Sequence, residues 1–158
     1  MTIRIGSGYD VHAFAPNRPL ILGGVTIPFE RGLSGHSDAD VVIHAVVDAL
    51  LGAAAMGDIG RHFPSNDERW KNQPSAVFLD YVYDLLYQHH WKISNVDATI
   101  VAERPKMAPH IDAMRAHLAE HLRLDIGQVS IKATTTDGLG FTGREEGIAC
   151  YAVALIER

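Results

Sequence analysis

The sequence predicts an α+β sandwich in which a four-stranded mixed sheet is covered on one face by helices, in a split βαβ-like arrangement. The first observation is the order of the segments. β-Branched or alternating segments and segments with helical spacing follow one another as strand, helix, helix, strand, helix, strand, strand. The second is size: 158 residues, 47% of them hydrophobic, predict one domain covering residues 1–158 with a sizeable core.

Charge and cysteine content narrow the function classes. A formal net charge of −5 without a basic stripe argues against a nucleic-acid partner. The single cysteine, Cys150, lies in an apolar run and has no internal disulfide partner, so we expect a buried thiol in a reducing cytoplasm. The N-terminus enters a strand pattern at once and no apolar run would span a bilayer, so we expect no membrane association.

The first expected strand runs from Ile3 to Phe14 and carries two candidate metal ligands near its end. Asp10 and His12 are two residues apart, so both side chains point to the same side of an extended chain. A carboxylate and an imidazole together are part of a metal site, although a surface pair without function has the same spacing. A short hairpin turning at Gly23-Gly24 is expected to follow, and then a polar loop over 30–35.

The next expected element is a helix beginning near Asp38. Its apolar residues recur at helical spacing, and Ser37 followed by Asp40 resembles a capping box. Gly57 and Gly60 are expected to end it. Unpaired N–H groups before the first turn, near Ser37, favour an anion such as phosphate.

Asp40, His44 and Asp48 are spaced four residues apart and therefore share one face of this helix. If the opening strand lies beside the helix, His44 completes a set of one Asp and two His with an open fourth position, as in catalytic zinc sites. Asp48 would then orient a ligand imidazole. The alternative is a capped helix with solvated carboxylates and an ordinary, partly buried histidine.

The remaining chain supplies scaffold and a second candidate site. Polar residues without periodicity over 65–73 predict a mobile loop near the site entrance. Further elements are expected as helices over 74–90 and 109–123 and strands over 95–102, 129–133 and 147–156.

The loop that begins at Thr134 joins the last two expected strands and is rich in hydroxyl groups and glycine. Three consecutive threonines and Arg144 could meet phosphate, and Asp137 could hold a divalent cation. An ordinary glycine-rich hairpin loop is the alternative interpretation.

Five motifs, in order along nearly the whole chain, resemble the 2-C-methyl-D-erythritol 2,4-cyclodiphosphate synthases of the non-mevalonate isoprenoid pathway. They read G-Y-D-V-H-A-F, G-H-S-D-A-D with the downstream His44, G-A-A-A-M-G-D-I-G-R-H-F-P, A-E-R-P-K-M-A-P-H and I-K-A-T-T-T-D-G-L-G-F-T-G-R-E-E-G. The resemblance implies a phosphorus-oxygen lyase that cyclises 4-diphosphocytidyl-2-C-methyl-D-erythritol 2-phosphate and releases CMP. It also implies a homotrimer with active sites between subunits.

The resemblance assigns roles to individual residues. Zn²⁺ or another divalent ion would bind Asp10, His12 and His44, and Mg²⁺ or Mn²⁺ would bridge the substrate phosphates near Asp137. The catalytic pair that holds the transferring phosphate would be His36 and Thr135. The further substrate-binding residues would be Ser37, Asp58, Ile59, Gly60, Phe63 and Asp67 around the methylerythritol part, Ala102, Pro105, Lys106, Met107 and Ala108 around the cytidine diphosphate, and Thr134, Thr136, Asp137, Phe141 and Arg144 near the phosphates.

Two positions depart from the family pattern. Asp137 stands where the family usually has Glu, which shortens the side chain toward the second cation by one methylene. The usual Gly-Arg-Gly-Glu-Gly is Gly-Arg-Glu-Glu-Gly at 143–147, which affects the isoprenoid diphosphate site proposed for the family at the trimer axis. Two other functions stay open: a metal-dependent phosphohydrolase, and a non-catalytic binder of nucleotide or isoprenoid diphosphate.

Overall fold

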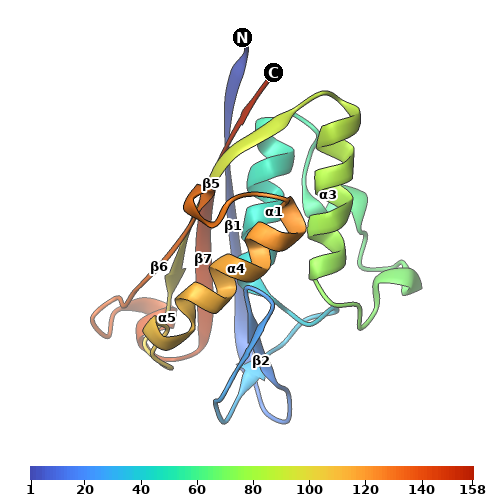
Figure 1. Cartoon of the computed structure of the whole chain (residues 1–158). Helices are drawn as coiled ribbons and strands as arrows, with labels where there is room; N and C mark the ends of the chain where they lie inside the picture. The colour runs from blue at the N-terminus through green and yellow to red at the C-terminus, as the bar shows by residue number, and fades with distance from the viewer.

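The computed structural model describes residues 1–158 and is built on a mixed sheet with the strand order β4-β1-β7-β5-β6 (Figure 1). The strands of this sheet are β1 (Ile3–Ala15), β4 (Gly32–Leu33), β5 (Lys92–Val101), β6 (Val129–Thr134) and β7 (Gly147–Glu157). A separate hairpin consists of β2 (Leu20–Leu22) and β3 (Val25–Ile27). Because β7 is antiparallel to both β1 and β5, those two strands are parallel and enclose it, as in a split βαβ unit.

The sheet has five strands, so the predicted count of four is wrong. The additional strand, β4, pairs with the end of β1 through Phe14 opposite Leu33 and Ala15 opposite Gly32. It lies in the segment that we expected to be a polar loop. Two residues are too few to show the alternation by which a strand is predicted.

Three helices of about three turns each cover one face of the sheet, as predicted (Figure 1). The helices are α1 (Val41–Ala53), α2 (Ile59–His62), α3 (Ala76–Gln88), α4 (Ile111–Leu122) and α5 (Gly140–Gly143), and the 3-10 turns are η1 (Glu68–Trp70), η2 (Ala108–His110) and η3 (Ile126–Gln128). The segment 65–73 thus contains the turn η1. The covering helices are α1, α3 and α4, and α1 lies innermost with most of its side chains buried.

Helix α1 begins later than predicted, and Ser37 is not its cap. The cap is Asp40, whose Oδ1 accepts a hydrogen bond from the Ile43 N–H at 3.1 Å. The N–H groups of Gly23 and Gly24, in the β2–β3 turn, donate to the same buried carboxylate at 2.9 and 2.7 Å. These three donors fix where the helix starts. It also ends at Ala53, before the glycines that we expected to end it.

Strand β1 and helix α1 are in backbone contact, and glycine is what allows it. A Cβ atom added at Gly8 would overlap with the carbonyl oxygen of Ala45, and one at Gly6 would overlap with that of Ala49. The close approach places the side chains of β1 that point toward the helix directly against α1.

The opposite face of the sheet is not covered by any helix. Ile5 is 71% exposed and Tyr151 is 56% exposed on this face, although both lie in the middle of long strands. We call this surface the open face; its large apolar residues are Ile3, Ile5, Tyr9, Val11, Tyr151 and Val153. A contiguous apolar surface of this kind marks an interaction site.

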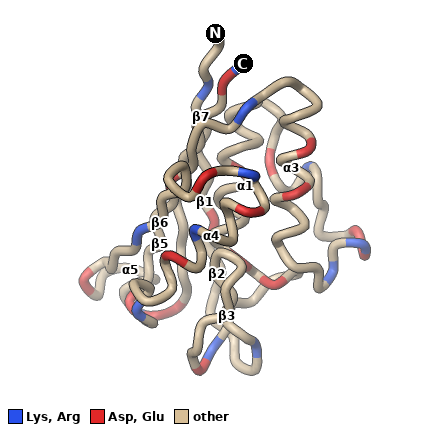
Figure 2. Tube along the Cα trace, in the orientation of Figure 1, with Lys and Arg blue, Asp and Glu red and all other residues tan.

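Charged residues are distributed over the whole chain. Figure 2 shows Lys and Arg interspersed with Asp and Glu along the chain, although helix α3 carries only acidic charges, those of Asp80 and Asp84. None of the helices has the length and apolar character needed to cross a membrane.

Candidate functional site

Strand β1 and helix α1 bring Asp10, His12 and His44 together, as predicted. The Oδ2 atom of Asp10 lies 2.9 Å from Nε2 of His12 and 3.2 Å from Nδ1 of His44, and these two nitrogens are 3.2 Å apart. Ligand atoms about 2.0–2.1 Å from a tetrahedral zinc ion are separated from one another by about 3.3 Å. The three atoms therefore form one face of a zinc coordination tetrahedron, and the group can hold a metal ion.

The Asp10 carboxylate supplies the negative charge that a cation requires, whereas a histidine binds a metal ion through a neutral imidazole. Burial raises the pKa of Asp10, but hydrogen bonds from His12 and His44 outweigh burial and hold it at about 2. The carboxylate is therefore ionised throughout the physiological range. For His12, burial opposes the charged form, while its hydrogen bond to Asp10 raises the pKa above the ordinary value.

Each imidazole is oriented by a second contact. Nδ1 of His12 donates to the Ser34 carbonyl oxygen at 2.7 Å, which leaves Nε2 free to bind a metal. Nε2 of His44 lies 2.9 Å from Oγ of Ser75, and the Ser75 hydroxyl in turn donates to the carboxylate of Asp38. The structure thus links a carboxylate to a ligand imidazole through a buried hydroxyl.

The residue that orients His44 is not the one we predicted. Asp48 lies one turn beyond His44, but its Oδ1 accepts a hydrogen bond from the Ile59 N–H at 2.7 Å. Asp48 therefore connects α1 to α2 and makes no hydrogen bond to the imidazole of His44. Sequence reasoning missed Ser75 because it lies 31 residues from His44, with no local pattern to connect the two.

A cavity of about 550 Å³ opens beside the triad and contains several predicted site residues. Its lining residues are His12, His36, Ser37, His44, Ile59, Gly60, Phe63, Pro64, Ser65, Asn66, Trp70 and Phe78. One wall is aromatic, because the Phe63 ring lies 4.9 Å from that of Trp70 and 4.3 Å from that of Phe78, centroid to centroid. The cavity combines a cation site with an apolar wall.

Two predicted residues lie near this cavity but make local contacts. Asp58 caps α2 by accepting from the Arg61 N–H at 2.9 Å. Asp67 caps η1 and forms an ion pair with Arg69 at 2.6 Å. Neither is among the residues that line the cavity.

The other predicted residues form a second group at the ends of β5 and β6. The Ala102 N–H donates to the Thr134 carbonyl oxygen at 3.0 Å, which joins the two segments. This group comprises Ala102, Pro105, Lys106, Met107, Ala108, Thr134, Thr135, Thr136, Asp137, Phe141 and Arg144. Strands β7 and β5 lie between β1 and β6. Within one chain, this second group is therefore separated from the triad.

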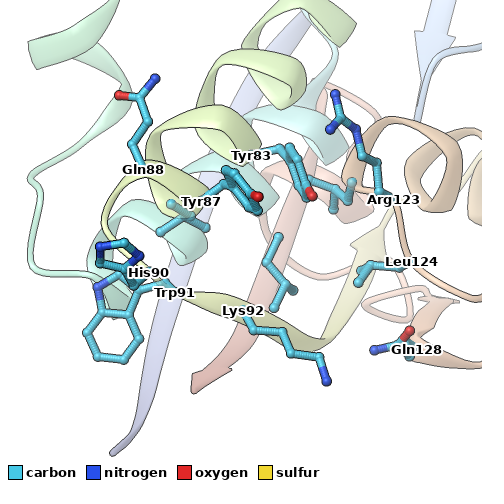
Figure 3. Close-up of a pocket in the computed structure, with 12 residues that line it drawn as sticks. Tyr83, Tyr87, Gln88, His90, Trp91, Lys92, Arg123, Leu124 and Gln128 are labelled. Carbon is cyan, nitrogen blue, oxygen red and sulfur yellow. The ribbon is translucent and has the colours of Figure 1, made fainter. Parts of the chain in front are cut away.

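A second, larger cavity of about 700 Å³ lies elsewhere, between the end of α3, the start of β5 and the end of α4. Tyr83, Tyr87, Lys92 and Arg123 are among the residues around it (Figure 3). It contains none of the predicted site residues, so the smaller cavity is the candidate active site.

Comparison with known proteins identifies the family. The YgbB family model matches residues 3–157. The 2-C-methyl-D-erythritol 2,4-cyclodiphosphate synthase of Clostridium perfringens is 57% identical over 98% of this chain and 99% of its own length.

Solved structures agree with this match. The bifunctional IspDF of Campylobacter jejuni is 42% identical with a TM-score of 0.94; the match covers 98% of this chain and 42% of that longer protein. The IspF of Plasmodium falciparum, solved as a CDP complex, is 36% identical with a TM-score of 0.86, over 98% of this chain and 95% of that one. The chain therefore belongs to the YgbB family, together with the 2-C-methyl-D-erythritol 2,4-cyclodiphosphate synthases.

Proposed function

We propose that this chain cyclises 4-diphosphocytidyl-2-C-methyl-D-erythritol 2-phosphate to 2-C-methyl-D-erythritol 2,4-cyclodiphosphate and releases CMP. The observation that carries the proposal is the triad of Asp10, His12 and His44, whose three ligand atoms lie within 3.2 Å of one another at the edge of a cavity. The family relatives carry the name of this activity. A cytoplasmic location is part of the proposal, since the single cysteine is a free thiol.

The reaction is an intramolecular phosphoryl transfer. An oxygen of the 2-phosphate attacks the β-phosphorus, the bond from that phosphorus to the oxygen of CMP breaks, and CMP leaves with the electron pair. Two anions must be brought together in line, so the site has to neutralise charge and fix geometry. Asp10, His12 and His44 would hold a divalent ion, which would act as a Lewis acid and neutralise charge on the diphosphate.

The chain's own residues position the substrate. His36 lines the cavity beside the triad, where it would meet the transferring phosphate, with Thr135 as the second phosphate contact. Ser37 lines the cavity too and would contact the methylerythritol part. Ile59, Gly60 and Phe63 line the same cavity and would contact the methylerythritol part together with Asp58 and Asp67.

The second group would receive the rest of the substrate. The cytidine diphosphate would lie against Ala102 and the 105–108 segment. Thr134, Phe141 and Arg144 would face the phosphates, and Asp137 would hold Mg²⁺ or Mn²⁺ near them. Thr136 was expected there as well, but its hydroxyl donates to the Leu139 carbonyl oxygen within the loop.

We further propose a homotrimer with each active site between two subunits. Two observations support it. The second group is separated from the triad by two strands within one chain, so a neighbouring subunit is needed to complete the site. The open face of the sheet is apolar and uncovered, as a subunit interface requires.

Product analysis tests the proposed activity. Incubation of the wild-type protein with substrate, Zn²⁺ and Mg²⁺ should give the cyclic diphosphate and CMP in equal amounts. His44→Ala should abolish this turnover, because one of the three metal ligands is lost, while its circular dichroism spectrum stays that of the wild type. His89→Ala is the matched control, since His89 is an exposed histidine at the end of α3 and should leave turnover unchanged.

Each alternative function gives a different result in this assay. Release of inorganic phosphate instead of a cyclic product would identify a phosphohydrolase. Unchanged substrate after prolonged incubation with both metals would identify a non-catalytic binder. Wild-type turnover by His44→Ala in metal-defined buffer would contradict the role of the triad.

A further inference from the structure

The loop formed by residues 134–138, here called the threonine loop, depends on a contact from outside itself. Asp137 and Gly138 both have positive φ angles, of 53° and 78°. A residue other than glycine in this conformation costs about 1 kcal/mol or more, so the chain does not favour the loop by local preference alone. The same turn directs two backbone N–H groups, those of Thr136 and Gly138, toward one point.

The side chain of Glu103 occupies that point. Its Oε1 atom accepts hydrogen bonds from the Thr136 N–H at 3.0 Å and from the Gly138 N–H at 3.3 Å, and it lies 3.4 Å from the Thr136 hydroxyl. All three contacts use the same oxygen. A charged acceptor between converging N–H groups is one of the stronger hydrogen-bond arrangements.

The threonine hydroxyls of the loop differ in their contacts. The Thr136 hydroxyl donates to the Leu139 carbonyl oxygen at 2.6 Å and lies 3.1 Å from Oγ1 of the buried Thr142. Thr136 is therefore turned into the loop. The Thr135 hydroxyl contacts only the exposed Asp137: it donates to Oδ1 at 3.4 Å and accepts from the backbone N–H at 3.3 Å.

We infer that Glu103 is a positioning residue that holds the threonine loop in the shape in which Thr135 and Asp137 meet the substrate's phosphates. This inference rests on the proposed function, which assigns phosphates to the loop. Glu103 directly follows Ala102 in the segment proposed to receive the cytidine diphosphate. It therefore fixes the relative position of the cytidine segment and the phosphate segment.

Two variants test the inference. Glu103→Ala removes the acceptor, so the amide hydrogens of Thr136 and Gly138 should exchange faster with solvent, measured by NMR. The KM for substrate should rise roughly tenfold, the effect of losing hydrogen bonds of this strength. Glu103→Gln keeps an oxygen at the same place and should restore both amide protection and KM to near the wild-type values.

The controls separate this inference from the proposed function. Glu120→Ala removes an exposed glutamate from α4 and should change neither measurement. Zinc content should be equal in all variants, because the triad lies on β1 and α1, away from Glu103. Wild-type amide exchange and KM in Glu103→Ala, or equal damage in Glu103→Ala and Glu103→Gln, would overturn the inference. If the wild-type protein itself forms no cyclic product, the proposed function fails, while amide exchange still decides whether Glu103 holds the loop.

Discussion

Ser75 is the residue through which the metal site depends on the surrounding fold. It is buried, it contacts Nε2 of the ligand His44, and its hydroxyl donates to Asp38. Residues that orient a metal-binding imidazole usually change metal affinity by about 10–100-fold when they are removed. We therefore predict that Ser75→Ala weakens zinc binding by a factor in this range, measured by competition with a chromophoric chelator.

Ser75→Ala should affect zinc binding more than the stability of the fold. The Ser75 backbone N–H donates to Asp38 at 2.9 Å and remains in the variant, and the Ser75 side chain makes no cap hydrogen bond to α3. The melting temperature of the metal-free protein should therefore change little. Ser130→Ala, at an exposed position on β6, is the matched control. Equal zinc affinity in Ser75→Ala and in the wild type would show that the hydroxyl does not orient His44.

At the scale of elements, the contact between β1 and α1 sets the geometry of the triad. A methyl group at Gly8 would overlap with the Ala45 carbonyl oxygen, so the helix has to move away from the strand. We predict that Gly8→Ala lowers the free energy of unfolding by about 1–3 kcal/mol or more, the usual cost of overpacking. Zinc affinity should fall as well, because the helix carries His44 and the strand carries the other two ligands.

Gly127→Ala is the matched control for this prediction. No atom lies within 4 Å of a Cβ added at Gly127, and its backbone does not have a positive φ angle. Its stability should stay within about 0.5 kcal/mol of the wild type in urea unfolding. Similar stability losses in the two variants would mean that glycine flexibility, and not the close approach, explains Gly8.

The elements also show what could be predicted from the sequence. The pair Asp10 and His12 was predictable because its spacing is local, two residues along a strand. His44 lies 32 residues from His12, so its place in the triad followed from the resemblance to the family and not from a local spacing. The start of α1 was not, because Asp40 is held by N–H groups of a hairpin 16 and 17 residues earlier. Strand β4 was not predictable because two residues show no alternation. The hydrogen bond between Ser75 and Asp38 was not predictable because 37 residues separate them.

At the scale of the whole molecule, the separation between the two groups of site residues connects the open face with activity, because a subunit bound at that face could complete the site. The metal ligands come from β1 and α1, and the threonine loop follows β6 at the far edge of the sheet. If a neighbouring subunit supplies the threonine loop, metal binding and turnover should respond differently to loss of the oligomer. Metal binding needs one chain, and turnover needs two.

Val153→Glu separates these two requirements. Val153 lies on the open face and is 41% exposed in the single chain, so a monomer tolerates a glutamate there, whereas the proposed trimer would bury its charge at the interface. We predict a monomer by size-exclusion chromatography with light scattering, zinc affinity within about twofold of the wild type, and turnover reduced at least about 100-fold. Tyr87→Glu, at a 71% exposed position on α3, should remain trimeric and active. A monomeric Val153→Glu protein with wild-type turnover would show that one chain completes the site alone.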